Sequence, residues 1–319
     1  MSGQLRTVWL DCDPGFDDWL TLLLVCRSPL LHLAGVSVVA GNAPLNMTLD
    51  NALRIRALHG LQAPIYAGAG KPLHTSSAVT AEYVLGKQGM TTLGDPLPST
   101  TQQADGLDGV SALLAHLRNQ KASKAQTTLV AIGPLTNVAK ALQQDAQAMR
   151  SLDEIVIMGG STDSGNHTPA AEFNIFADPE AADAVFRSGI KVRMFGLNVC
   201  RQVLLTQSHV QTVKSWASAE AQILSGYLDA YQRIRSADGS QPMPLYDPVV
   251  ALWLLAPELF EFQDAPVDIE LAGQYTRGMT VCDVRNRAKR PANVRIAMSA
   301  DGDAAMTLLL QQLKKALAS

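Results

Sequence analysis

An acidic stretch near the start of the chain constrains the fold more than any other feature. Residues 11–18 (DCDPGFDD) place four carboxylates between two apolar segments, 7–10 and 19–26. These flanks predict that the cluster lies at the end of a buried strand, where ionised carboxylates are rarely left without a positive partner. Neighbouring acids also repel one another. A hard divalent cation is the simplest partner, and a solvated acidic turn is the alternative.

Predicted strands and helices alternate through the first two thirds of the chain. Apolar, often β-branched runs predict strands at 5–10, 31–40, 63–67, 126–132, 154–158 and 191–195, and helical patterns fall at 17–28, 45–59, 109–120, 135–144 and 179–187. This alternation is typical of an α/β fold with a mainly parallel open sheet flanked by helices. Helices are predicted further on at 206–235, 249–255 and 301–317, and antiparallel edge strands at 267–270 and 279–284. We expect a single domain, residues 1–319.

Charge and cysteine usage narrow the classes of function. The formal net charge is −3 over 319 residues, so no basic excess argues for nucleic acid or an anionic membrane as a partner. The longest apolar runs are too short to cross a bilayer. The four cysteines include no CxxC pair, and residues 1–6 lack the apolar core of a signal peptide. We expect a cytoplasmic protein with reduced cysteines.

Polar or glycine-rich sites follow several predicted strands. They are Gly41-Asn42, Ile132-Gly133-Pro134 and Met158-Gly159-Gly160. Ligands bind at the carboxyl ends of strands in open α/β sheets, so these sites are expected to meet beside the acidic cluster. Taken singly, a Gly-Gly pair indicates a tight turn, and Asn42 fits a turn residue as well as a ligand contact. Two long loops, 68–105 and 161–171, are predicted to be lids or binding loops.

In their order along the chain, these motifs resemble the signature of the nucleoside hydrolase family. The resemblance rests on six motifs: residues 11–18, 41–42, 132–137 (IGPLTN), 158–160, 171–174 (AEFN) and 247–248. It covers essentially the whole chain and is closest to bacterial ribonucleoside hydrolases that accept both purine and pyrimidine nucleosides. The resemblance implies a Rossmann-like fold, bound Ca²⁺, and hydrolysis of the N-glycosidic bond of ribonucleosides to free base and ribose. It also implies a homodimer or homotetramer that acts in nucleoside catabolism and salvage.

The same resemblance implies a set of cation ligands: Asp13, Asp18, the backbone carbonyl of Ile132, and Asp247. Asp13 would also be the general base, taking a proton from a Ca²⁺-bound water. Oxygen-only ligands suit Ca²⁺, and a bound cation makes a nearby water more acidic. For Asp11 we expect a supporting role, in which it orients backbone amides of a helix or loop.

On the substrate side, the resemblance implies that five residues hold the ribose: Asp17, Asn42, Asn166, Glu172 and Asn174. Such contacts matter because glycosidic cleavage passes through an oxocarbenium-like state. Glu172 and Asn174 are two apart, so both would face one way in an extended segment.

Three further side chains are candidates for substrate contacts. Met158 would pack against the sugar, although a core methionine at a strand end is the alternative. Tyr231 and Arg235 lie at helical spacing on a helix that flanks the base pocket in the family, and either is a candidate contact to the base.

Two departures from the family pattern concern the leaving base. Many members have His immediately before the late Asp, where this chain has Tyr246, and a second His in the first long loop, where it has Leu85. A phenol is a far weaker acid than an imidazolium, yet it donates a hydrogen bond or stacks on a ring, so Tyr246 is a candidate catalytic residue. His74 and His167 lie in the two long loops as possible substitutes. Solvated loop histidines are the simpler interpretation.

Two other functions fit parts of the sequence. A non-catalytic nucleoside or ribose binder would keep the cation and ribose residues, but ribose binding alone does not require a base at Asp13. The sequence Asp11-Cys12-Asp13 after a strand also resembles haloacid-dehalogenase-like phosphatases, with an Asp nucleophile. In that class the Asp17-Asp18 pair and Asp247-Pro248 have no role. Release of free base from inosine or uridine separates these hypotheses.

Overall fold

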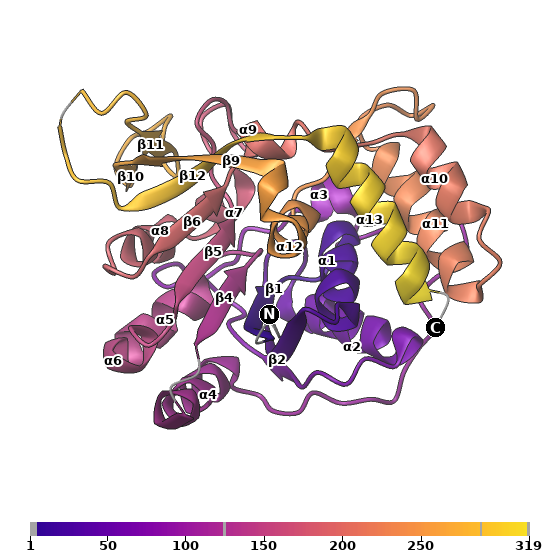
Figure 1. The fold of residues 1–319 in the computed structure, drawn as a ribbon, viewed down its shortest axis with the longest axis horizontal. Helices are drawn as coiled ribbons and strands as arrows, with labels where there is room; N and C mark the ends of the chain where they lie inside the picture. The colour runs from indigo at the N-terminus through magenta and orange to yellow at the C-terminus, as the bar shows by residue number, and fades with distance from the viewer. Residues whose placement is uncertain (1–4, 124–125, 288, 318–319) are drawn as a thin grey trace.

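A central sheet of eight strands organises the chain (Figure 1). The computed structural model describes residues 5–123, 126–287 and 289–317, without the side chains of 121–123. The strand order is β3-β2-β1-β4-β5-β6-β12-β9, parallel except that β9 runs antiparallel to β12. The strands are β1 Arg6–Cys12, β2 Leu31–Val38, β3 Ile65–Ala67, β4 Thr127–Ala131, β5 Glu154–Met158, β6 Val192–Phe195, β9 Phe260–Ala265 and β12 Val294–Ala300. The predicted single α/β domain with a mainly parallel sheet is confirmed.

Helices cover both faces of this sheet (Figure 1). They are α1 Phe16–Arg27, α2 Leu45–His59, α3 Glu82–Leu85, α4 Gly109–Ser123, α5 Thr136–Gln144, α6 Ala146–Met149, α7 Phe173–Ala177, α8 Pro179–Phe186, α9 Leu197–Cys200, α10 Gln207–Lys214, α11 Ala219–Gln232, α12 Pro248–Leu255 and α13 Gly302–Leu317. Alternate side chains of β1 enter different apolar clusters, because successive side chains of a strand point to opposite faces. Leu10 joins the cluster with α1, α12 and α13, whereas Trp9 joins the cluster with α4, α5 and α8.

The C-terminal third differs from the sequence prediction in detail. The predicted antiparallel strands do form, as β10 Val267–Ile269 and β11 Thr280–Cys282, but as a separate pair beside the main sheet. The antiparallel edge of the main sheet is β9, which the sequence did not indicate because polar residues interrupt its apolar pattern. The predicted helix at 206–235 is two helices, α10 and α11, because Ser218 caps a new helix by accepting from Ala221 N. A second short pair joins β7 Leu204–Leu205 to β8 Met243–Pro244.

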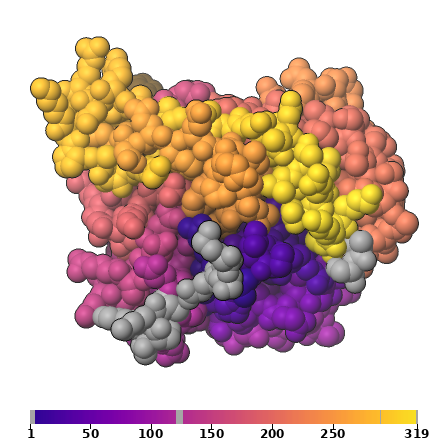
Figure 2. Space-filling view, in the orientation of Figure 1, coloured from indigo at the N-terminus to yellow at the C-terminus, as the bar shows by residue number. Residues whose placement is uncertain are grey.

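Strand order reverses at β1, whose neighbours are β2 and β4. The carboxyl ends of these strands therefore border a crevice in which a ligand can bind. Helices α12 and α13 pack against α1, so the C-terminal segments, orange and yellow, meet the indigo N-terminal segment on one face (Figure 2). No helix in the described part of the chain is both long and apolar enough to span a membrane. The sequence prediction that residues 1–6 form no signal peptide concerns, in part, residues 1–4, which lie outside the described residues.

Candidate active site

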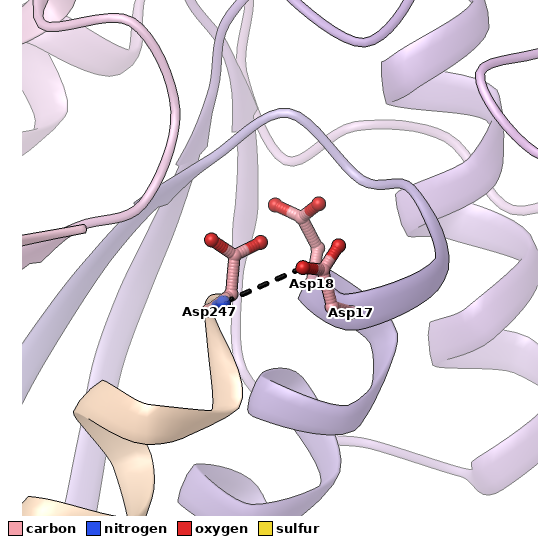
Figure 3. A group of neighbouring side chains, drawn as sticks. All are labelled: Asp17, Asp18 and Asp247. Carbon is pink, nitrogen blue, oxygen red and sulfur yellow. Dashed lines mark hydrogen bonds between the residues drawn. The ribbon is translucent and has the colours of Figure 1, made fainter. Parts of the chain in front are cut away.

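Three buried carboxylates meet at the carboxyl edge of the sheet, where α1 and α12 begin (Figure 3). Asp17 and Asp18 lie in the first turn of α1, and Asp247 directly precedes α12. One carboxylate oxygen from each lies within 4.8 Å of the others. A hydrogen bond also links two of these residues directly: the backbone N–H of Asp247 donates to Asp17 Oδ2 at 3.4 Å. Residues 230 positions apart therefore build one anionic group.

Asp13 lies beside this group in a frame of backbone and amide donors. Asn42 donates its backbone N–H to Asp13 Oδ2 at 2.7 Å and its side-chain amide to Asp13 O and Asp18 Oδ2. Asp18 also accepts from the N–H groups of Asp13 and Gly15. A Cβ on Gly41 would overlap Asp13 Oδ2. Asn42 is thus a connector between the acidic stretch and the end of β2.

Burial and mutual repulsion raise the pKa of these carboxyl groups. Burial raises the pKa of Asp18 to about 7, with Asp17 as the next cause, and it raises that of Asp17 as well. The pKa values of Asp13 and Asp247 are raised well above the usual range, first by burial and then by neighbouring aspartates. Such groups need protons or a cation at neutral pH. The donors are all oxygens, so the residues fit a hard cation such as Ca²⁺.

Asp11 has side-chain partners in place of the backbone amides that the sequence suggested. Its Oδ2 accepts from Ser37 Oγ and, at 2.8 Å, from Asn137 Nδ2, while Oδ1 has no partner among the residues that the structure describes. Asn137 Oδ1 in turn accepts from Ala69 N at 2.7 Å. Asp11 therefore reaches a loop amide only through Asn137, because its position inside β1 aims it toward β2 and α5.

Glu172 and Asn174 form the opposite wall, and α7 begins between them. The expected extended segment is a helix start, because the Glu172 carboxylate caps α7 by accepting from Asn174 N and Ile175 N. It also accepts from Gly160 N at 3.0 Å. Burial raises the pKa of Glu172 to about 7 despite these bonds. Asn174 Nδ2 donates to the carbonyls of Ile132 and Met158, and so ties the ends of β4 and β5 together.

A single pocket of about 240 Å³ connects these groups. Its lining includes most of the residues that the sequence singled out: Asp13, Asp17, Asn42, Ile132, Met158, Asn166, Glu172, Asn174, Tyr231, Tyr246 and Asp247. Asp18 is buried behind the lining. Arg235 is not brought into the pocket; it is exposed and donates to Pro242 O at 3.2 Å. His74 is also outside the lining, whereas His167 belongs to it.

An apolar wall and three side chains near the mouth complete the lining of the pocket. Phe16, Leu85, Ile234 and Met243 make the apolar side, and Tyr83, Val84 and Phe173 lie near its mouth. The sequence analysis missed Phe16, Ile234 and Met243. Phe16 lies within residues 11–18, directly before Asp17, and this place beside the acids was the available signal. The other two gave none, because only the fold of residues 233–247 brings them to the pocket.

Four polar aromatic side chains border this space: Tyr83, His167, Tyr231 and Tyr246. Burial raises the pKa of Tyr246 far above its ordinary value, so its hydroxyl keeps its proton. The Tyr231 hydroxyl is already used, since it donates to Pro244 O at 2.9 Å while its ring packs on Phe16. His167 packs against Phe176 with ring centroids 4.5 Å apart, and its Nδ1 lies 3.2 Å from the Tyr83 hydroxyl.

Comparison with known proteins defines the class. The family model for inosine-uridine preferring nucleoside hydrolases matches residues 8–307. The chain is 38% identical over 312 residues to the pyrimidine-specific ribonucleoside hydrolase RihA of Shewanella sp. (strain ANA-3), covering 97% of this chain and 96% of that protein. A purine-preferring ribonucleoside hydrolase from Gardnerella vaginalis has a similar structure, with a TM-score of 0.88, 26% identity, and coverage of 98% and 99%. The plant nucleoside hydrolase PpNRh1 gives a TM-score of 0.87 at the same identity and coverage.

The chain therefore belongs to the inosine-uridine preferring nucleoside hydrolase family, as its motifs suggested.

Proposed function

We propose that the chain hydrolyses the N-glycosidic bond of ribonucleosides in this pocket, releasing free base and ribose. The observation that supports the proposal is the pocket itself, whose lining includes Asp13, Asp17 and Asp247 together with Glu172 and Asn174. The names of the relatives, which are ribonucleoside hydrolases, support the same reaction. A simple binder would use Asp13 as a cation ligand but would not require it as a base.

Asp13 acts as the general base in this proposal. It accepts a proton from the attacking water, while Asn42 holds its carboxylate by a hydrogen bond and Gly41, without a side chain, leaves room for it. Asp13, Asp18, Asp247 and the carbonyl of Ile132 hold a Ca²⁺ ion. When bound, the cation makes a neighbouring water easier to deprotonate and orients the sugar hydroxyls. Asp17 lies close enough to the same group to share the cation or to accept from the ribose.

The ribose lies between the acidic group and the wall opposite. Asn166, Glu172 and Asn174 contact its hydroxyls, and Met158 packs against the ring. Positive charge develops on the sugar as the bond to the base breaks, and the surrounding carboxylates stabilise it.

The base lies against the apolar wall beside Tyr246. The tyrosine ring stacks on the base or its hydroxyl donates to it, because the raised pKa keeps that hydroxyl protonated. The relatives named above differ in base, pyrimidine-specific in one and purine-preferring in the other. We propose that this chain accepts both kinds, with Phe16 and Tyr246 as the ring-facing surfaces.

A substrate panel tests the proposal. Purified protein is incubated with inosine, adenosine, uridine and cytidine, with and without a chelator, and free base is measured by chromatography. We expect base release that the chelator stops and added Ca²⁺ restores. Binding of nucleosides without release of base from any of them would leave the non-catalytic binder as the better hypothesis.

We further propose a cytoplasmic homodimer or homotetramer. The family resemblance supports the assembly, and the reduced state of all four cysteines supports the compartment. Light scattering after gel filtration measures the mass directly, and a mass of one chain, 34.1 kDa, would contradict the assembly.

A further inference from the structure

The loop 161–171 is built to hold one shape. The backbone N–H groups of Asn166, His167 and Thr168 all point to the carbonyl of Ala171, each at 3.2 Å. Gly165 N donates to Pro169 O at 3.0 Å, and a Cβ at Gly165 would overlap the carbonyl of Ala171. The loop is therefore bonded to itself, and its placement decides where Asn166 and His167 enter the pocket.

Both ends of the loop are fixed to the body. At its start, Thr280 Oγ1 accepts from Ser161 N at 2.8 Å and donates to Ser161 O at 2.6 Å. At its end, Glu172 caps α7. Within the loop, Ser161 Oγ donates to Asp163 Oδ1 at 2.6 Å, and Asn166 Oδ1 accepts from Phe173 N at 2.9 Å. The middle of the loop, residues 163–165, also has a partner outside it.

Arg201 holds the middle. It directly follows α9, which begins after the carboxyl end of β6. Its Nη1 lies 2.6 Å from Asp163 Oδ1, and its Nη2 donates to the carbonyls of Ser164 and Gly165 at 3.0 and 3.3 Å. One guanidinium therefore binds acceptors on three consecutive residues. A lysine ammonium cannot reproduce this planar fork.

We propose that Arg201 is a positioning residue for the reaction, which sets the loop 161–171 so that Asn166 and His167 face the substrate. The inference rests on the proposed function of the pocket. The positioning role does not require Arg201 to touch the substrate, and Arg201 is not among the residues that line the pocket. Its effect passes through Asp163 and the loop backbone.

The geometry predicts which kinetic constant changes. Asn166 is exposed at the mouth, whereas Asp13 is buried at the reacting end. Displacing the loop weakens contacts that ground state and transition state share, so KM rises while kcat stays nearly constant. The side chains of Arg201 and Asp163 are 34% and 55% exposed, and so exposed a pair adds little to stability.

The test compares Arg201→Gln and Arg201→Lys with a matched control, Arg187→Gln. Arg187 forms a similarly short ion pair with Asp183, but on α8 and away from the pocket. We expect both Arg201 variants to raise KM for a nucleoside about tenfold, with kcat within about threefold and Tm within about 2 °C. Arg187→Gln should match the wild type. Asp163→Asn removes the contact from the loop side, and the double variant with Arg201→Gln should be no worse than either single one.

Two results overturn the inference separately from the proposed function. If the wild type releases base and Arg201→Gln keeps the KM of the wild type, Arg201 has no positioning role. Additive effects of Arg201→Gln and Asp163→Asn would also refute it, because the two residues would then act through different contacts. If Arg201→Gln lowers Tm strongly, Asp163→Asn decides, since unchanged KM there contradicts the role. A wild type that releases no base from any nucleoside overturns the proposed function and this inference together.

Discussion

A buried histidine behind the acidic cluster makes stability depend on pH. His59 ends α2, and its Nε2 accepts from Trp19 Nε1 at 2.9 Å, which ties α2 to the helix that carries Asp17 and Asp18. Burial lowers the pKa of His59 from 6.5 to about 4, and the charge of Arg27 adds to this. The imidazole must therefore stay neutral in the folded protein, because a proton on Nε2 would face the indole N–H.

The size of the effect follows from that pKa difference. A pKa that folding lowers gives stability that is present above the unfolded value of 6.5 and is lost as the pH falls toward 4. The full loss in the free energy of unfolding is about 3 kcal/mol, and about 2 kcal/mol of this loss falls between pH 7 and pH 5. The variant His59→Gln replaces the imidazole by an amide that does not titrate. The amide keeps an acceptor for Trp19 and removes the proton linkage.

Urea unfolding of the wild type and His59→Gln at pH 7 and pH 5 measures this term. The aspartates of the active site titrate in both proteins, so their contribution cancels in the difference. We expect the free energy of unfolding of the wild type, relative to the variant, to fall by about 2 kcal/mol between the two pH values. A relative stability that changes by less than about 0.5 kcal/mol would refute the reasoning, because that is close to the precision of such extrapolations.

Two further predictions concern the site. Gly41→Ala should displace the carboxylate of Asp13 and lower kcat by about 100-fold, since its Cβ would overlap Oδ2; Gly70→Ala, where the Cβ makes only ordinary contact with Leu45, is the control and should keep full kcat. Ca²⁺ at 100 times its dissociation constant should raise Tm by about 4 °C over chelated protein in a calorimetric scan, because it binds the folded carboxylates and relieves their repulsion. An unchanged Tm would argue against a calcium site at Asp13.

The sequence predicted the parts of the fold that have a strong local signal. Residues 11–18 follow an apolar run and precede an apolar helix, and the structure has β1 and α1 there. Strands β9 and β12 were missed because their polar residues hide the pattern. They join the sheet only because β12 pairs with β6 and β9 pairs with β12. The linker at 215–218 (SWAS), which contains no Gly or Pro, likewise hid a helix boundary.

The site was predictable where motifs stand at strand ends and unpredictable where loops decide. Asp13, Asn42, Ile132 and Met158 meet in the pocket because they lie at or just after the ends of parallel strands that finish at one edge. Arg235 follows the helical spacing of Tyr231, but α11 ends at Gln232 and the chain turns away, so the two side chains part. The role of Glu172 as a helix cap also depends on a local turn that no spacing rule reveals.

The variant Asp13→Asn tests the central claim most directly. It removes the base and keeps the size of the side chain. Turnover of the best nucleoside of the panel should fall by about 10³-fold, within the range that a positioned general base contributes. Circular dichroism and Tm should show an intact fold. If Asp13→Asn releases base at the rate of the wild type, Asp13 is not the general base, and the account of this active site is contradicted.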